Sequence, residues 1–150
     1  MTILFFGQPA SGKTTLAKII AQQISNAVHI DGDEWRDITK NKDYSKEGRM
    51  ANLKGAFDMA LLLEKKGFTP VLSFVAPYEQ MRSYLKQNSV ANYQIYLHYS
   101  GDVERGRKNY FVVDFEEPTE DSCLLKLCTS ELNVDECVNK INTKLRNIYG

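Results

Sequence analysis

The chain has 150 residues, which suits a single domain with one hydrophobic core. Its 19 Lys and Arg balance its 19 Asp and Glu, so no overall charge favours nucleic acid or an anionic membrane as a partner. No apolar run matches a membrane span, no cleavable leader is recognised, and the three cysteines lack C-x-x-C spacing. We therefore expect one cytoplasmic domain over residues 1–150, with reduced thiols and no nucleic-acid or membrane partner.

Strands and helices are predicted to alternate along the chain. Short apolar runs predict strands at 2–6, 27–30, 68–75, 93–98 and 124–127. Helical spacing predicts helices at 15–21, 46–66, 77–87 and 134–147, while 101–108 reads as a short polar helix or loop and 114–121 as a loop. This alternation predicts an α/β fold, with a five-stranded parallel sheet covered by helices on both faces. Ligands of such folds bind at the carboxyl ends of the strands.

The most specific motif lies between the first strand and the first helix. Residues 7–14 read GQPASGKT and fit the phosphate-loop pattern G-x-x-x-x-G-K-[ST] at every fixed position. Backbone N–H groups at the start of the helix cradle a polyphosphate, Lys13 reaches its β- and γ-phosphates, and the Thr14 hydroxyl can ligate Mg²⁺. The loop therefore predicts a kinase fold that binds ATP and Mg²⁺ through Gly7, Pro9, Ala10, Ser11, Gly12, Lys13, Thr14 and Thr15.

Two carboxylates, Asp31 and Asp33, follow the second predicted strand. One interpretation is a turn held by local side-chain hydrogen bonds. The other is a catalytic pair, in which one carboxylate accepts a proton from a substrate hydroxyl and the other holds water or Mg²⁺. We favour the catalytic pair, because phosphoryl transfer to a hydroxyl needs an oriented proton acceptor facing the phosphate loop.

Further side chains point to an anionic, flat substrate. Five of the six arginines are Arg36, Arg49, Arg82, Arg105 and Arg107, and guanidinium groups bind phosphate or sulfate bidentately. Residues 73–78 read either as a buried strand and helix start or as a backbone wall against a flat ligand. The aromatic residues in predicted loops, which either anchor those loops or stack a base, are Tyr44, Phe111 and Phe115.

Taken together, these segments resemble the adenylylsulfate kinases, which use ATP to phosphorylate the 3′-hydroxyl of adenylylsulfate. Residues 31–36 (DGDEWR) resemble their D-G-D-x-x-R segment. Residues 44–52 (YSKEGRMAN) resemble F-S-x-x-D-R-x-x-N, with Tyr for Phe and Gly for Asp. Residues 73–78 (SFVAPY), followed by Arg82, resemble S-F-I-S-P-Y…R, and residues 94–97 match the next strand. The resemblance covers most of the chain.

The resemblance implies a role for each matching residue. Asp33 accepts the proton of the attacking 3′-hydroxyl, Lys13 assists the transfer, and Asp31 supports Mg²⁺ with Thr14. The anionic part and the sugar of the substrate nucleotide are held by Arg36, Arg49 and Asn52, and Tyr44 stacks on its base. The same pocket is lined by Ser73, Phe74, Val75 and Pro77, and Arg105 lies near the ATP base.

The stretch from Arg107 to Pro118 departs from the family, because the A-R-x-G and F-T-G portions are missing. The second stacking aromatic of the family lies in the missing part, and Phe111 or Phe115 is the candidate substitute. A related family, the cytidine diphosphoramidate kinases, also phosphorylates a nucleotide 3′-hydroxyl. The sequence favours an adenylylsulfate kinase-like enzyme and leaves open a cytidine diphosphoramidate kinase, a kinase for a non-nucleotide hydroxyl, and a homodimeric assembly.

Overall fold

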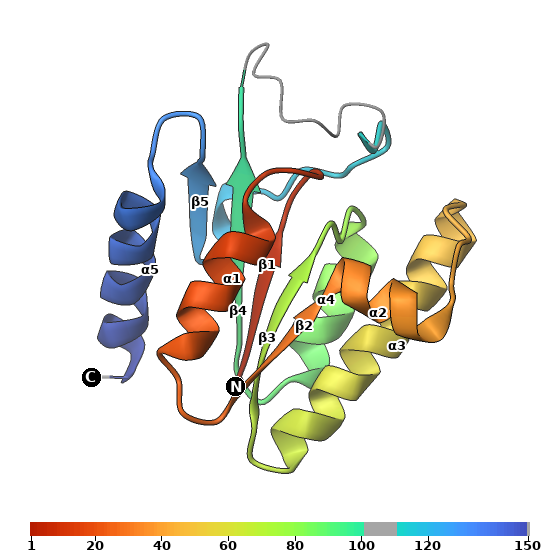
Figure 1. Cartoon of the computed structure of the whole chain (residues 1–150), viewed down its shortest axis with the longest axis horizontal. Coiled ribbons are helices and arrows are strands. Elements are labelled where there is room, and N and C mark those ends of the chain that lie inside the picture. The colour runs from red at the N-terminus through yellow and green to blue at the C-terminus, as the bar shows by residue number, and fades with distance from the viewer. Residues whose placement is uncertain (101–110, 150) are drawn as a thin grey trace.

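The computed structural model describes residues 1–100 and 111–149. Its centre is a five-stranded sheet in the order β2-β3-β1-β4-β5, in which every neighbouring pair is parallel (Figure 1). The strands are β1 (Thr2–Phe6), β2 (Ala27–Asp31), β3 (Thr69–Phe74), β4 (Asn92–His98) and β5 (Leu125–Cys128). The predicted sheet is confirmed, and each strand end lies within one residue of its predicted position.

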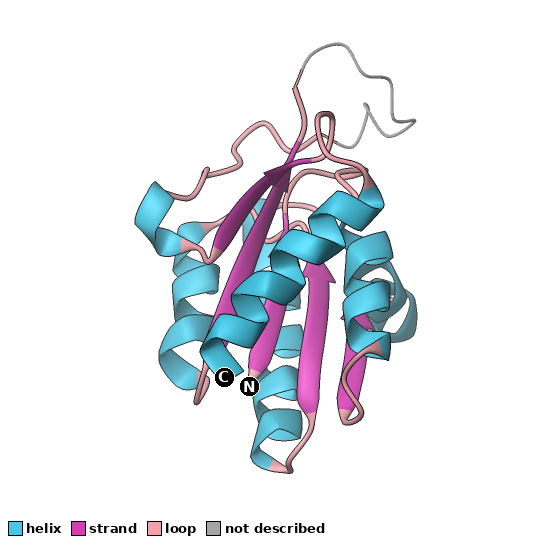
Figure 2. Cartoon of the chain, turned by 90° about the vertical axis from the view of Figure 1, so that its left-hand side faces the viewer, coloured by secondary structure: helices cyan, strands magenta, loops and turns pink. Residues whose placement is uncertain are grey.

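Helices cover both faces of the sheet, as Figures 1 and 2 show. They are α1 (Lys13–Gln22), α2 (Gly32–Thr39), α3 (Lys46–Lys65), α4 (Glu79–Asn88) and α5 (Val134–Tyr149), with a short 3₁₀ turn, η2 (Glu120–Ser122). Side chains of α1 and α5 pack in one apolar cluster, and side chains of α3 and α4 pack in the other. Within the described residues, no helix has the length and apolar character needed to cross a membrane.

The central strand β1 contributes side chains to both apolar clusters. Successive strand residues point to opposite faces, so Ile3 and Phe5 enter the cluster of α1 and α5, whereas Leu4 and Phe6 enter that of α3 and α4. All four side chains are fully buried. Burying each one stabilises the fold by about 1.5–3 kcal/mol. The strand that leads into the phosphate loop is thus firmly packed on both faces of the sheet.

Helix α2 is the element that the sequence prediction missed. The Asp31 Oδ2 atom caps it by accepting hydrogen bonds from the Asp33 N–H at 3.1 Å and the Glu34 N–H at 3.4 Å. None of its eight residues is fully buried, although Trp35 packs against the core cluster of α3 and α4. A helix this short offers few turns for a periodicity argument, and its clearest sequence signal is the acidic first turn behind a capping Asp. The predicted element at 101–108, with Arg105 and Arg107, lies outside the described residues.

Candidate active site

A cavity of about 1010 Å³ lies where β1, β2 and β3 reach their carboxyl ends. It is lined by Pro9, Ala10, Gly12, Lys13, Thr14, Thr15, Asp31, Gly32, Asp33, Arg36, Tyr44, Arg49, Asn52, Leu53, Ser73, Phe74, Val75, Ala76, Pro77, Phe111 and Val112. Nearly every site residue predicted from the sequence is in this set. The exceptions are Gly7 and Ser11, which are buried within the phosphate loop, and Arg105, which lies outside the described residues.

The phosphate loop depends on glycine at two positions. Gly7 has a φ of +152°, and a Cβ atom there would lie 2.2 Å from the Leu97 carbonyl oxygen, so only glycine fits. Gly12 precedes α1 with a φ of +101°. Within the described residues no side chain caps this helix start. Its first-turn N–H groups are therefore placed to donate to a bound anion.

Lys13 is held over the loop by the loop itself. Its Nζ donates a hydrogen bond to the Gln8 carbonyl oxygen at 2.8 Å and lies 3.4 Å from the Ser11 Oγ. The residue is 9% exposed and lines the cavity. The ammonium group is thus already oriented where a polyphosphate would approach.

Asp31 links three elements through its carboxylate. Its Oδ1 accepts hydrogen bonds from the Thr14 hydroxyl at 2.7 Å and the Ser73 hydroxyl at 2.8 Å, while its Oδ2 caps α2. Burial raises the pKa of this carboxyl, but the hydrogen bonds from Thr14, Ser73 and the Glu34 backbone outweigh burial, and the net pKa is lowered. Asp31 is therefore ionised at neutral pH. A hydroxyl beside a carboxylate fits Mg²⁺, which takes few protein oxygens together with water and phosphate.

Behind Asp31, the Ser73 hydroxyl lies 2.8 Å from the His29 Nε2. Because Ser73 donates its proton to Asp31, the ring nitrogen of His29 is the donor of this bond. Burial lowers the pKa of His29, so the imidazole is neutral at pH 7. The chain of bonds fixes Ser73, and with it Asp31, from the far side of the cavity.

Asp33 occupies a different environment from Asp31. It lies in the first turn of α2, is exposed, and lines the same cavity as Lys13. A helix N-terminus favours a negative charge at this place. Both carboxylates line the cavity, but Asp31 is buried and held by hydrogen bonds from three elements, whereas Asp33 is exposed.

One part of the cavity wall is polar and aromatic and contains Arg36, Tyr44 and Asn52. The Arg36 guanidinium lies 4.1 Å from the centre of the Tyr44 ring and donates to the Asn41 carbonyl oxygen at 3.1 Å. One face of Tyr44 is thus covered by a cation, and the ring remains 59% exposed. Asn52 is only 7% exposed, and its Oδ1 accepts no hydrogen bond from the described part of the chain. A ligand that enters the cavity can supply a donor to this oxygen, as can a water molecule.

Arg82 does not belong with the arginines that face the cavity. It is 1% exposed and donates to the carbonyl oxygens of Ala76 at 2.7 Å and Glu116 at 2.6 Å. Its guanidinium also lies 4.7 Å from the centre of the Phe6 ring. Arg82 therefore holds the cavity wall at 73–77 in place, and the interpretation of this residue as an anion ligand was wrong.

The structure distinguishes the two aromatic candidates for the missing stacking residue. Phe115 stacks on Tyr96 at 5.9 Å and on Phe6 at 6.5 Å between ring centres, so it belongs to the core cluster of α3 and α4. Phe111 is 53% exposed and lines the cavity. Of the two, only Phe111 is placed where it could contact a bound base.

The contacts that Gln8 and Asp114 make were not foreseen from the sequence. The Gln8 side-chain amide pairs with the backbone of Val112, and Asp114 accepts a hydrogen bond from the Tyr78 hydroxyl at 2.9 Å. Asp114 also lies 3.6 Å from an Nη1 atom of Arg49. Gln8 stands at a variable motif position and Asp114 in a stretch without a motif, so no local pattern could indicate either contact.

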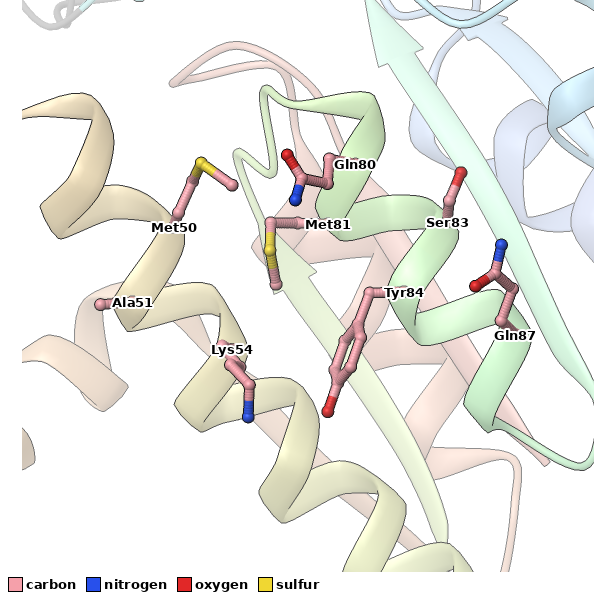
Figure 3. A pocket seen from close by; sticks show the side chains of 8 residues that line it. All are labelled: Met50, Ala51, Lys54, Gln80, Met81, Ser83, Tyr84 and Gln87. Carbon is pink, nitrogen blue, oxygen red and sulfur yellow. The ribbon is translucent and has the colours of Figure 1, made fainter.

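A second hollow, of about 520 Å³, lies between α3 and α4 (Figure 3). Figure 3 shows Met50 and Lys54 on α3 across from Met81 and Tyr84 on α4. The Lys54 Nζ lies 5.5 Å from the centre of the Tyr84 ring and 2.8 Å from an Asp58 carboxylate oxygen. Among the described residues that line it, none comes from the phosphate loop or the Asp31 and Asp33 region, so we place the chemistry in the larger cavity.

Similarity to known proteins agrees with this geometry. A "Probable adenylyl-sulfate kinase" from Pyrococcus abyssi is 29% identical over 102 residues, covering 65% of this chain and 59% of that relative. A "Cytidine diphosphoramidate kinase" from Campylobacter jejuni is 22% identical over 159 residues, covering 93% of this chain and 92% of that relative. The chain spans about half to three-fifths of the adenylyl-sulfate kinases that it matches.

Solved kinase structures share the fold of this chain. The structure of the Mycobacterium tuberculosis APS kinase in complex with AMPPNP and APS superimposes with a TM-score of 0.79 at 21% identity, covering 97% of this chain and 96% of that one. Shikimate kinase from Aquifex aeolicus superimposes with a TM-score of 0.66 at 19% identity, which identifies the P-loop kinase fold. The sequence profile of the family described as Adenylylsulphate kinase matches residues 1–109. Because this match covers well over half of the chain, the protein belongs to the adenylylsulphate kinase family of nucleotide-binding kinases.

Proposed function

We propose that the protein transfers the γ-phosphoryl group of ATP to the ribose 3′-hydroxyl of a small anionic nucleotide. The observation that carries this proposal is the composition of the 1010 Å³ cavity. A phosphate loop and an exposed carboxylate share it with two arginines and an exposed tyrosine. A phosphoryl donor and a nucleotide acceptor need these two kinds of surface side by side.

The donor side supplies positive charge and backbone donors. Lys13 and the N–H groups at the start of α1 bind the phosphates and stabilise the charge that spreads over the transferring group. Thr14 and Asp31 are the residues that would hold Mg²⁺, which neutralises the β- and γ-phosphate charge when bound. Ser73 keeps the Asp31 carboxylate turned toward Thr14.

The acceptor side supplies the proton acceptor. The 3′-oxygen attacks the γ-phosphorus, the bond from that phosphorus to the β,γ-bridging oxygen breaks, and ADP leaves with that oxygen. The hydroxyl proton passes to the Asp33 carboxylate. Asp31 is poorly suited to this role, because its oxygens already accept two hydroxyl bonds and cap α2. Asp33 is exposed and lines the cavity, so we assign the role of proton acceptor to Asp33.

Recognition of the acceptor follows from charge and shape. Arg49 lies on the cavity and can bind an anionic group bidentately, as can Arg36, which also backs the Tyr44 ring. The other face of Tyr44 is free of that cation and is suited to stacking on a base. The buried Asn52 Oδ1 then accepts a hydrogen bond from a hydroxyl or amino group of the nucleotide.

Two acceptors are candidates. Adenylylsulfate is the first, because the family profile and the D-G-D-x-x-R segment belong to its kinases. A cytidine diphosphate derivative is the second, favoured by one observation. The Campylobacter jejuni relative aligns over 93% of this chain, whereas the adenylylsulphate kinase profile ends at residue 109.

The test is a phosphoryl-transfer screen with ATP and Mg²⁺. The acceptors are adenylylsulfate, a cytidine diphosphate derivative, gluconate and shikimate, and ³¹P NMR identifies each product. The proposal predicts a new phosphate monoester on a nucleotide and none on the sugar acid or shikimate. Lys13→Ala is the control that should remove the signal. Transfer to gluconate or shikimate alone, or to no acceptor, would contradict the proposal.

A further inference from the structure

Gln8 makes a paired contact with a segment far away in the chain. Its Nε2 donates to the Val112 carbonyl oxygen at 2.8 Å, and the Val112 N–H donates to its Oε1 at 2.9 Å, across 104 residues of sequence. The side-chain amide thus satisfies both backbone groups of a residue that is only 5% exposed. This is the pairing that a neighbouring strand would otherwise provide.

The segment that Gln8 holds is fastened at every second residue. Beyond Val112, Asp114 accepts the Tyr78 hydroxyl bond at 2.9 Å, and the Glu116 N–H donates to the Pro77 carbonyl oxygen at 2.8 Å. The end nearest the phosphate loop is attached by Gln8. Removing the Gln8 amide would therefore release that end while the two later attachments remain.

Phe111 stands directly before the Gln8 attachment. Its side chain is 53% exposed, so packing fixes it weakly, and its place on the cavity depends on where the neighbouring backbone lies. The Gln8 carbonyl oxygen, by contrast, accepts the Lys13 ammonium bond at 2.8 Å. A substitution of the Gln8 side chain keeps this carbonyl, so its effect should be confined to the Phe111 side of the cavity.

We propose that Gln8 is a positioning residue for the acceptor: its side-chain amide holds Phe111 at the cavity, where the ring forms part of the binding surface for the acceptor base. This inference rests on the proposed nucleotide acceptor. It assigns base recognition in part to a phosphate-loop residue at a variable motif position. The loop that binds the phosphoryl donor then also contributes to specificity for the acceptor.

The kinetic test is Gln8→Met, which keeps the side-chain length and removes both hydrogen bonds. The KM for the accepted nucleotide should rise roughly two- to tenfold, the range of one aromatic stacking contact, while the KM for ATP changes less than twofold. Phe111→Ala should give a similar rise, and the double variant should be no worse than Phe111→Ala alone. Gln80→Met, in the hollow between α3 and α4, is the matched control. Additive effects of the two changes, or an unchanged acceptor KM in Gln8→Met, would overturn the inference.

A second measurement does not depend on which acceptor is used. Amide hydrogen exchange at Val112 should be faster in Gln8→Met than in the wild type, with the melting temperature held within a few degrees. Gln8→Glu keeps an acceptor for the Val112 N–H but sets a carboxylate oxygen against the Val112 carbonyl, so it should raise the exchange rate less than Gln8→Met does. Equal exchange rates in wild type and both variants would refute the attachment. A wild type that phosphorylates neither nucleotide would instead refute the proposed function and leave the exchange result to decide the role of Gln8.

Discussion

Replacing Asp33 by Asn should nearly stop phosphoryl transfer while leaving the fold almost unchanged. Asn keeps the shape of the side chain but cannot accept the hydroxyl proton, and removing a general base typically costs about 10²–10⁴ in rate. Asp33 is exposed in the first turn of α2, where its charge contributes about 0.3–1 kcal/mol through the helix dipole. The loss of stability should therefore stay below about 1 kcal/mol, or roughly 2–4 °C in Tm.

Asp31→Asn is the matched comparison, and its expected pattern is the reverse. Asn has a single acceptor oxygen, and we expect that oxygen to keep capping α2 in place of Oδ2. The amide nitrogen then stands in place of Oδ1, so the Thr14 and Ser73 hydroxyls lose their acceptor. A hydrogen bond to a charged group contributes about 1.5–3 kcal/mol, so losing two should cost about 3–6 kcal/mol. The Mg²⁺ concentration for half-maximal rate should also rise, because the metal-facing charge is gone.

The pH dependence of the unfolding free energy tests the stabilisation assigned to Asp31. The folded pKa of Asp31 is lowered, so its stabilisation is present above the unfolded pKa near 4 and is lost as the pH falls through the folded pKa. The gap in unfolding free energy between wild type and Asp31→Asn should be full at neutral pH and should narrow below about pH 4.

The assay is steady-state kinetics of both variants with varied ATP and Mg²⁺, joined to urea unfolding. We expect a large kcat loss with a near-normal ATP KM for Asp33→Asn, and lower stability with a shifted Mg²⁺ dependence for Asp31→Asn. A near-normal kcat in Asp33→Asn would refute the role given to this residue. If Asp31→Asn lost more kcat at saturating Mg²⁺, the two carboxylates would have to exchange roles.

Other changes separate catalytic from structural residues. Lys13→Ala should lower kcat by roughly a hundredfold or more with an unchanged circular dichroism spectrum, and a normal kcat would remove the phosphate loop from the mechanism. Arg82→Met should lower the free energy of unfolding, measured in urea, by roughly 2–5 kcal/mol, because two buried carbonyl oxygens lose their donor. An unchanged Tm with a raised KM for the acceptor would instead show that Arg82 binds the anionic substrate. Phe115→Ala should cost about 2–4 kcal/mol of stability, and its acceptor KM in the folded enzyme should match the wild type. Finally, kcat/KM for adenylylsulfate and a cytidine diphosphate derivative should differ by less than about a thousandfold, and a larger preference for adenylylsulfate would show that the altered stretch before Pro118 does not change the substrate.

The sheet and the phosphate loop could be predicted because their causes are local. Apolar runs mark buried parallel strands, and the fixed glycines and Lys13 of the loop are required by backbone geometry and phosphate charge. The position of Asp31 and Asp33 at the carboxyl edge of the sheet could be predicted for the same reason, because the strand before them is short and apolar. Their division into a buried and an exposed carboxylate needed the hydrogen bonds of Thr14 and Ser73, which join separate elements.

The features that escaped prediction are set by contacts between distant parts of the chain. Helix α2 is only eight residues long and buries none of them fully, so it has too few turns for helical spacing to be recognised. A buried Arg82 reads like any surface arginine until its carbonyl partners are known. Phe111 and Phe115 are four positions apart in one loop, and only the packing of Phe115 on Tyr96 separates them. The Gln8 attachment to Val112 joins two segments that share no pattern.

The central claim is that the acceptor atom is a ribose 3′-oxygen. The most direct test is the position of the new phosphate in the nucleotide product, read from the coupling between phosphorus and the ribose 3′-proton in NMR. The account predicts coupling of the new phosphate to the 3′-proton, and its loss in Asp33→Asn. A phosphate on the 2′-oxygen, on the existing phosphate chain, or only on gluconate or shikimate would contradict it.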